Sequence, residues 1–389
     1  MLENNQKIPE GWSVKKISDL GTTVSGGTPD TNNPEYWDGD VLWVTPSEVS
    51  ALSNRFIWDT ERKITEKGLK QSSTKLLPVN SLIICTRATI GDCCINKKPI
   101  CTNQGFKNII VTGNNVDFLY YLISKNKHEL IRKACGSTFL EISKKDIDNL
   151  KVLLPPLAEQ EKIAEILGTW DEAIEKLSSL IEQKKFLKKG LMQKLFLDLK
   201  NVSFKRFDEV FTDYSDKNHS DYPLLSATQD LGVIPRTMLD GRVMSPEGSL
   251  AGYKLVQKGD FVISLRSFQG GLEYSSYYGI ISPAYTVLKP KMNISRQFYK
   301  YFFKSYEFVN KYLSIAVIGI RDGKQISYPD LKSVKIPYPN LFNQQAIADV
   351  LTKADEEIDL LNKKLILFKE QKKGLMQQLL TGQIRVKVN

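Results

Sequence analysis

Two stretches of the chain place basic side chains among aromatic ones, a combination that can bind nucleic acid. The residues of the first stretch are Lys67, Lys70, Lys75, Arg87, Lys97, Lys98, Lys107, Tyr36, Trp37, Trp43 and Phe106. Those of the second are Arg236, Arg242, Lys254, Arg266, Arg296, Arg321, Tyr253, Phe268, Tyr274 and Tyr285. Lysines suit phosphate contacts, whereas Arg, Asn and Gln can make paired hydrogen bonds to base edges. A single such residue is more often a solvated surface charge, so the hypothesis rests on both sets and on a formal net charge of +10.

The motifs of catalytic and cofactor sites are missing from the sequence. The glycine-containing segment 319–324 is too short for a phosphate-binding loop, and no G-x-G occurs anywhere. Ser282–Tyr285 faintly resembles the S/D/N-P-P-[FYW] motif of amino-methyltransferases but lacks its second proline. Only two histidines, His128 and His219, are present for general-base chemistry. We therefore predict a binding component that is not an enzyme and that uses no cofactor and no metal.

The cysteines and the N-terminal segment bear on the compartment. All five cysteines lie in the first half with no C-x-x-C pair, which argues against a disulfide framework and a zinc site. The N-terminal segment lacks the apolar core of a signal peptide, and no apolar run is long enough to span a membrane. We expect reduced, mostly buried thiols in a cytoplasmic protein without a membrane partner.

One long segment occurs twice and must position these side chains. LPPLAEQEKIAEIL from Leu154 matches YPNLFNQQAIADVL from Tyr338, and both copies end in KKGLMQ, at a shift of 184 residues (339 − 155). Apolar residues step by four and three over more than four heptads, which predicts a coiled coil with a rod length on the order of 60 Å. Lys184 and Lys188 occupy two seam positions, where we expect the coil to open toward the second domain or a docked subunit. Two unrelated amphipathic helices are the alternative, but the shared register would then be a coincidence.

The segments between the repeats carry short β-type runs followed by a helix, so the fold class is α+β. GDFVISLRSFQGG from Gly259 aligns with NSLIICTRATIGD from Asn80, which places Arg266 on Arg87. The predicted organisation is a globular domain, a coiled-coil helix, a second similar domain, and a second helix with a C-terminal tail, at 1–153, 154–199, 200–337 and 338–389. If the halves are related by a pseudo-twofold, the two helices are antiparallel and the chain ends meet near the first domain.

The whole chain resembles the specificity subunit of a type I restriction-modification system. The resemblance rests on the opening IPEGW, the GGTP turn, PEYWDGDVLWVTPSEV from Pro34, and the TRATIG and NQGF segments. The two copies of the segment that precedes each coil are its most specific markers.

The resemblance implies that the globular domains are target-recognition domains, each reading one half of an asymmetric, interrupted site in double-stranded DNA. The helices would set the gap between the halves and dock two modification subunits, which carry the adenine methyltransferase site. Restriction subunits with ATP-driven translocation and nuclease activity would complete the assembly. The specificity subunit itself would have no catalytic role. We expect half-sites centred about one to one and a half turns of B-DNA apart.

The residues that we expect to contact DNA are loop residues beside the matched segments. In the first domain they are Ser25, Thr28, Arg87, Asn103 and Gln104, and in the second Arg266, Ser267, Gln269, Ser282 and Arg321. The second domain lacks the GGTP turn, so roles are not transferred between the domains position by position.

Three alternatives stay open at this point. A nucleic-acid-binding adaptor of another system, such as an RNA-binding coiled-coil dimer, would not prefer duplex DNA with two separated motifs. A scaffold without a nucleic-acid role would show little salt dependence of binding. A stand-alone adenine methyltransferase would bind S-adenosylmethionine without partners.

Overall fold

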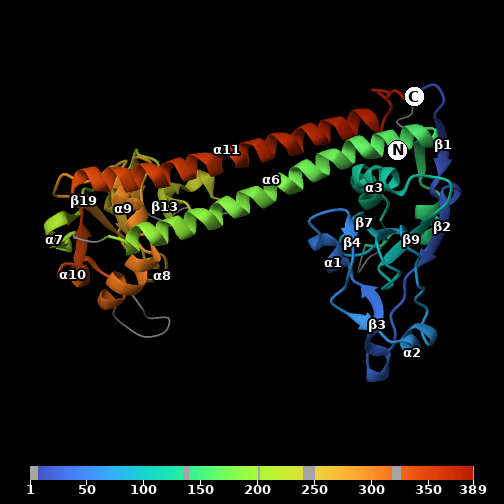
Figure 1. Ribbon diagram of the computed structural model, residues 1–389, viewed down its shortest axis with the longest axis horizontal. Coiled ribbons are helices and arrows are strands. Elements are labelled where there is room, and N and C mark those ends of the chain that lie inside the picture. Colours follow the sequence, from blue (N-terminus) through green and yellow to red (C-terminus); the bar gives the residue numbers. More distant parts are fainter. Residues whose placement is uncertain (1–7, 135–139, 200–201, 240–249, 318–325, 389) are drawn as a thin grey trace. The chain divides into compact units, whose positions relative to one another are not determined.

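The computed structural model describes residues 8–134, 140–199, 202–239, 250–317 and 326–388. The chain divides into two compact units (Figure 1). The first unit comprises Met1–Ser179 and Lys363–Asn389, and the second comprises Leu180–Asn362. Each unit therefore holds one globular domain and a part of each long helix.

The first unit is built on a five-stranded and a three-stranded sheet. The larger has the order β2 (Gly21–Ser25), β9 (Phe106–Val111), β6 (Leu82–Cys85), β7 (Cys93–Asn96), β4 (Phe56–Ile57). The smaller has the order β5 (Lys63–Ile64), β3 (Trp37–Val44), β8 (Ile100–Thr102). A separate pair joins β1 (Ser13–Lys16) to β10 (Lys151–Leu154). The helices are α1 (Pro46–Ala51), α2 (Glu66–Lys70), α3 (Val116–Lys125), α4 (Lys127–Lys133) and α5 (Lys144–Asp148).

Strand β6 is buried on both faces, because successive side chains of a strand point to opposite sides. Leu82 and Ile84 pack with Phe118 of α3 in one core, whereas Ile83 and Cys85 pack with Val44 in another. The central strands of this sheet are thus held between the tyrosine-rich helix and the smaller sheet.

The second unit repeats this plan with shorter strands. Its four-stranded sheet has the order β12 (Phe211–Tyr214), β19 (Thr286–Pro290), β16 (Phe261–Ile263), β17 (Glu273–Tyr274). Three further pairs are β11 (Ser203–Arg206) with β20 (Lys335–Tyr338), β13 (Leu225–Thr228) with β14 (Gly232–Pro235), and β15 (Lys254–Val256) with β18 (Gly279–Ile281). The helices are α7 (Phe207–Val210), α8 (Ser267–Gly270), α9 (Arg296–Phe302) and α10 (Tyr328–Leu331). Its core is aromatic, with Phe207, Phe211, Phe261, Phe302 and Phe303 fully buried.

The two long helices are α6 (Leu157–Leu197) and α11 (Leu341–Leu379). In the first unit, Glu159 pairs with Arg385 beyond the end of α11, and Trp170 meets Phe368 at 5.4 Å between ring centroids. Residue numbers rise along one helix as they fall along the other, so the helices are antiparallel there. In the second unit, the Lys184–Glu357 and Lys188–Asp355 ion pairs show the same direction.

The expectation for Lys184 and Lys188 needs correction. Lys188 does reach the second domain, since its ammonium lies 5.4 Å from the ring centroid of Tyr301. Neither lysine marks an opening of the helix pair, however. Lys188 pairs with Asp355, and Lys184 Nζ lies 2.6 Å from Glu357 Oε1, so both replace apolar seam contacts by ion pairs between α6 and α11.

The described ends of the chain meet in the first unit, as the order of elements predicts (Figure 1). Arg385 donates a hydrogen bond of 2.8 Å to the carbonyl of Glu10. Gly382, three residues after the end of α11, has a positive φ of 71°, a conformation that glycine adopts without strain.

Two further expectations concern membranes and thiols. No helix in the described parts of the chain combines the length and the apolar character that crossing a membrane requires. The four described cysteines are free thiols, and burial raises the pKa of Cys85 to about 12 and that of Cys101 to about 11. Cys135 lies outside the described residues.

Candidate nucleic-acid interface

Five predicted contact residues gather at one edge of the five-stranded sheet of the first unit. Antiparallel pairing places Ser25 opposite Lys107 and Cys85 opposite Phe106, so β2 and β6 end where β9 begins. The loops that follow β2 and β6 and the loop that precedes β9 therefore meet. We call Ser25, Thr28, Arg87, Asn103 and Gln104 the first loop edge.

The glycine turn after β2 holds this edge together. The amide of Gly27 donates 2.9 Å to the carbonyl of Thr102, and a Cβ at Gly26 would overlap the carbonyl oxygen of Asn103. Only a residue without a side chain allows this approach, which explains the paired glycines. The hydroxyl of Thr28 then hydrogen-bonds the amide oxygen of Gln104, and Asn103 Oδ1 accepts from Gly105 N at 2.8 Å. The amide nitrogens are left as the donors that these two side chains can offer to a ligand.

Arg87 is held in place by a carboxylate. Its guanidinium lies 2.6 Å from Glu141, which also lies 3.5 Å from the Lys107 ammonium. Desolvation raises the pKa of Glu141, but the hydrogen bond from Arg87 and the charges of Arg87 and Lys107 outweigh it, so this pKa is lowered. The next residue, Ala88, has a positive φ of 57°, which is strained for a residue other than glycine. Arg87 is therefore presented by a constrained loop and is charged and partly exposed.

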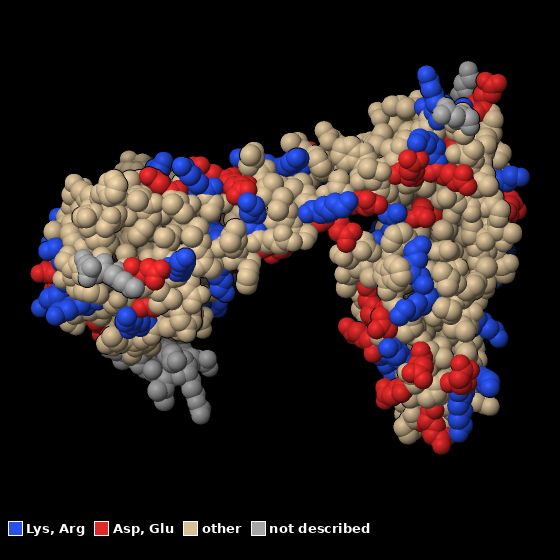
Figure 2. All heavy atoms as spheres, in the orientation of Figure 1, with Lys and Arg blue, Asp and Glu red and all other residues tan. Residues whose placement is uncertain are grey.

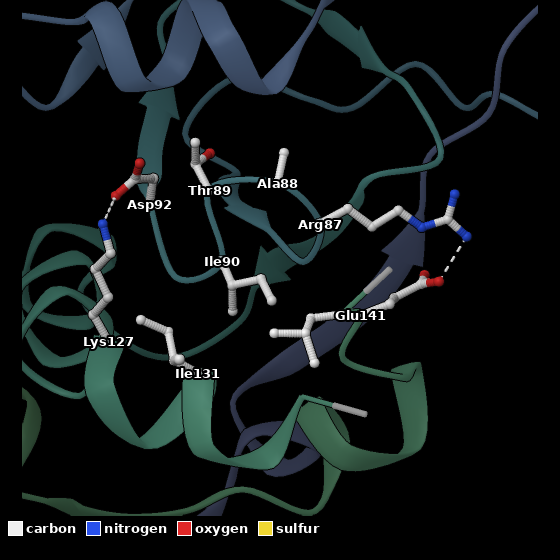
Figure 3. A pocket seen from close by; sticks show the side chains of 9 residues that line it. Arg87, Ala88, Thr89, Ile90, Asp92, Lys127, Ile131 and Glu141 are labelled. Atoms are coloured by element: carbon white, nitrogen blue, oxygen red, sulfur yellow. Dashed lines mark hydrogen bonds and ion pairs between the residues drawn. The ribbon is translucent and has the colours of Figure 1, made fainter. Parts of the chain in front are cut away.

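A hollow of about 840 Å³ adjoins Arg87 (Figure 3). Figure 3 shows the Arg87–Glu141 pair on one side and the Asp92–Lys127 pair on the other, with Ile90 and Ile131 between them. The Asp92–Lys127 pair ties the loop after β6 to α4.

The predicted contact residues of the second unit have more varied positions. Arg266 and Gln269 are exposed in the segment that follows β16, Arg266 just before the short helix α8 and Gln269 within it, and Ser282 precedes β19. Pairing of Ile263 with Thr286 brings these two loops to the same edge of the sheet. Arg266, Gln269 and Ser282 form the second loop edge. Arg321 lies outside the described residues.

The structure corrects the prediction that Ser267 is an exposed loop residue. The residue is fully buried, and its hydroxyl accepts a hydrogen bond of 2.8 Å from the amide of Ser264. Its position beside Arg266 in the sequence suggested exposure, but the short helix α8 turns its side chain inward.

Sequence reasoning missed the group that fixes the second loop edge. Lys304 pairs with the fully buried Glu273 at 2.6 Å and donates to the carbonyls of Gln229 and Gly270. Burial raises the pKa of Glu273, and the charge of Lys304 opposes that rise. Like the Asp92–Lys127 pair of the first unit, this pair ties the segment after the central strand to the rest of the domain. Its two residues do not align with Asp92 and Lys127, so alignment of the halves does not reveal it.

The second missed feature is a three-residue tie that occurs in both units. In the first, Asp171 of α6 accepts 2.5 Å from the Tyr121 hydroxyl and pairs with Lys372 of α11. In the second, Asp355 of α11 accepts 2.8 Å from Tyr301 and pairs with Lys188 of α6. Each tie joins a domain to both helices. The signal in the sequence was an aspartate repeated within an apolar seam.

A buried glutamine repeats in the same way. Gln160 donates 3.0 Å to the carbonyl of Pro155 and accepts 3.0 Å from the amide of Asn115. Gln344 donates 2.7 Å to Pro339 and accepts 2.8 Å from the amide of Ser295. Each glutamine therefore fixes the start of a long helix against the loop before the tyrosine-rich helix.

Charged side chains of both signs are mixed on the face of the protein seen in Figure 2. Lysines and arginines alternate there with acids, so on that face the positive net charge is not gathered into one patch. On that face, an anion would depend on local arrangements of basic residues.

The family model described as "Type I restriction modification DNA specificity domain" matches residues 9–183 and 213–369. The chain belongs to this family. Among specificity subunits of Methanocaldococcus jannaschii, that of MjaIX is 37% identical over 214 residues, which cover 54% of this chain and 49% of that protein. That of MjaVIII is 27% identical over 416 residues, covering 98% of this chain and 95% of that protein. The chain thus spans about half of the first relative and nearly all of the second.

Solved specificity subunits share the fold. The S subunit from M. genitalium aligns with a TM-score of 0.55 at 18% identity, covering 97% of this chain and 98% of that one. The HsdS subunit from Thermoanaerobacter tengcongensis aligns with a TM-score of 0.52 at 18% identity, covering 99% and 100%. The resemblance inferred from the motifs is confirmed, as is a mixed α and β fold in two repeated regions.

Proposed function

We propose that the protein is the DNA-recognition subunit of a type I restriction-modification complex and has no catalytic role. The observation that carries the proposal is a family match to both halves of the chain, whose similar frames expose different loop edges. Arg87 follows β6 and Arg266 follows β16, the equivalent strands of the two sheets. Two domains that share a fold but expose different side chains are suited to recognise two different base sequences.

Each globular domain would read one half of a bipartite, asymmetric site in double-stranded DNA. The proposed contacts in the first domain are Ser25, Thr28, Arg87, Asn103 and Gln104, and in the second Arg266, Gln269, Ser282 and Arg321. Arginine recognises guanine and the amides recognise adenine through paired hydrogen bonds in the major groove. The domains proposed are 1–153 and 200–337.

The helical segments 154–199 and 338–389 would form an antiparallel coiled coil with pseudo-twofold symmetry. It would set the gap between half-sites and dock two modification subunits, to which restriction subunits bind. The repeated Asp171 and Asp355 ties support this proposal, because they fix each domain to both helices. Deleting one heptad from both helices is expected to shorten the tolerated gap between half-sites. An unchanged gap would refute the proposal that the helices set it.

The central experiment is co-expression of the full chain with a modification subunit, followed by mapping of methylated adenines. We expect two short motifs at a fixed gap. A single continuous motif, or methylation by this chain alone, would contradict the proposal. Competition experiments separate DNA recognition from the function of a general nucleic-acid adaptor. Unlabelled duplex DNA should displace the bound target DNA from the protein, whereas double-stranded RNA should not.

A further inference from the structure

A cavity of about 580 Å³ in the first unit lies where α3 and α4 meet both long helices. Its charged lining comprises Lys125 of α3, Asp171 of α6, and Lys369, Lys372 and Lys373 of α11. His128 of α4 lies beside them, and Ile174 and Met376 form apolar walls. The cavity does not include any residue of the first loop edge.

The charges around this cavity do not balance. Four lysines face one aspartate, so the lining carries a net charge of +3 (4 − 1) with His128 neutral. The Asp171 carboxylate is already used by Lys372, by Arg55 at 3.5 Å and by the Tyr121 hydroxyl. It therefore has little capacity left to neutralise Lys125, Lys369 or Lys373.

Burial affects Lys125 in addition. Its side chain is partly buried, and burial lowers its pKa. Within the described parts of the chain, no carboxylate pairs with it. A partly buried ammonium without a counter-charge is unfavourable, and an anion that enters the cavity would relieve it.

The second unit provides an internal comparison on the helix side. A shift of 184 residues places Lys185, Lys188 and Lys189 on Lys369, Lys372 and Lys373. Lys185 is neutralised by Glu182 at 2.8 Å, three residues earlier. At the position of Glu182 the second helix has Ile366 (182 + 184), so Lys369 has no acid three residues before it. Glu370 stands instead three residues before Lys373, where the first helix has Phe186 (370 − 184).

The domain side differs as well. Tyr121 and Tyr301 make equivalent bonds to Asp171 and Asp355, which sets a shift of 180 between α3 and α9 (301 − 121). With this shift, Ser305 and Phe308 take the places of Lys125 and His128, and both are buried. The basic cavity of the first unit thus has no equivalent at the repeated positions of the second, mainly because of the change on its domain side.

We propose that this cavity is a phosphate-binding site. Lysine side chains from two elements line one space, and an ammonium group with three donors suits the tetrahedral oxygens of a phosphate. In a complex with DNA, the phosphate would belong to the duplex backbone, a source that rests on the proposed function. A free phosphate or the phosphate of a nucleotide is the other source of the same chemistry.

The test compares two matched double variants of the full chain, K369Q/K373Q and K185Q/K189Q. All four lysines are exposed and sit at repeated positions, so both variants remove the same charge without disturbing a core. Binding of duplex DNA is measured over a salt series. K369Q/K373Q is expected to reduce the slope of log affinity against log salt concentration by about 0.9 for each DNA phosphate that is no longer neutralised. The affinity near 0.1 M salt should then fall roughly eightfold for each such phosphate. K185Q/K189Q is expected to change both much less.

A second measurement uses inorganic phosphate as the probe, with sodium chloride at equal ionic strength as the control. Phosphate is expected to raise the unfolding temperature of the unaltered chain and of K185Q/K189Q, but not of K369Q/K373Q. Protection by phosphate with unchanged DNA binding in K369Q/K373Q would assign the site to a free phosphate and overturn the DNA source. Equal behaviour of the two variants in both measurements would overturn the site itself. Retention of two methylated motifs in that case would leave the proposed function standing.

Discussion

The two units join domain to helix with the same side chains, yet they differ at the loop edges and in the core. Tyr121, Asp171 and Lys372 make one tie, and Tyr301, Asp355 and Lys188 make the other. Beyond these ties, the first core is largely aliphatic and the second largely aromatic. The geometry of the contacts that join each domain to the two helices is therefore the same in both units, whereas the interior of the domain differs.

One clamp of the first unit has no equivalent at the repeated position of the second. Glu159 accepts from Trp12 Nε1 at 3.0 Å and from Arg385 at 2.7 and 2.8 Å, and so fastens the C-terminal tail to the first domain. At the equivalent position, 184 residues later, stands the exposed Asn343. The first unit carries this extra clamp because it must hold a segment from the far end of the chain.

The largest expected effect comes from breaking the ties. Asp171→Ala leaves Lys372, Arg55 and Tyr121 without their shared carboxylate and is expected to lower the free energy of unfolding by about 2–4 kcal/mol. Asp355→Ala removes the acceptor of Lys188 and Tyr301 and should lower the free energy of unfolding by about 1–2 kcal/mol. All five tryptophans lie before residue 180, so their fluorescence during urea unfolding reports the first unit, while circular dichroism follows both. Lys176→Gln, which removes only an exposed ion pair with Glu172, is the surface control, and equal losses for both aspartates would refute the ranking.

The loop edges are tested by Arg87→Ala and Arg266→Ala in the complex with modification subunits. Each is expected to cost about 1–3 kcal/mol of binding at its own half-site and to relax base preference there. Methylation of duplexes with one half-site altered measures this effect. A loss that is uniform over all sequences would mean that these arginines contact phosphates and not bases.

The clamp is tested by Glu159→Ala against Asn343→Ala. The first leaves the Trp12 N–H and the Arg385 guanidinium without their buried acceptor and should cost about 1–2 kcal/mol. The second removes an exposed side chain and should change stability by less than about 0.5 kcal/mol. Tryptophan fluorescence of the first unit measures the difference, and a neutral Glu159→Ala would show that the tail is held by apolar packing alone.

The smallest expected effect is a difference in pH dependence. The pKa of Glu273 is raised in the folded chain, so its contribution to stability falls as pH rises from the unfolded value of 4.5 through the folded one. The pKa of Glu141 is lowered, so its contribution is present above 4.5 and is lost as pH falls through the folded value. Glu273→Gln and Glu141→Gln should each remove one of these two opposite slopes, measured by urea unfolding followed by circular dichroism over a pH series. Slopes of the same sign would contradict this assignment.

The architecture could be predicted because its signals are local. Heptad spacing indicated helices at 154–199 and 338–389, close to the observed Leu157–Leu197 and Leu341–Leu379. The ties could not, because Asp171 and Lys372 are 201 residues apart and a lysine in an apolar seam does not reveal its partner. Ser267 was misplaced for a related reason: burial of a small hydroxyl depends on one turn of α8, which leaves no periodic trace.

The division of the chain between the units has a consequence for its synthesis. The second unit, Leu180–Asn362, is one continuous segment, whereas the first is completed by Lys363–Asn389. Leu379 and Leu380 lie in the first core, and Arg385 closes the clamp on Glu159. A chain emerging from the ribosome therefore makes most of its first unit early but can finish that core only after the whole second unit has been translated. Of the two units, the first begins to be made before the second and is completed after it.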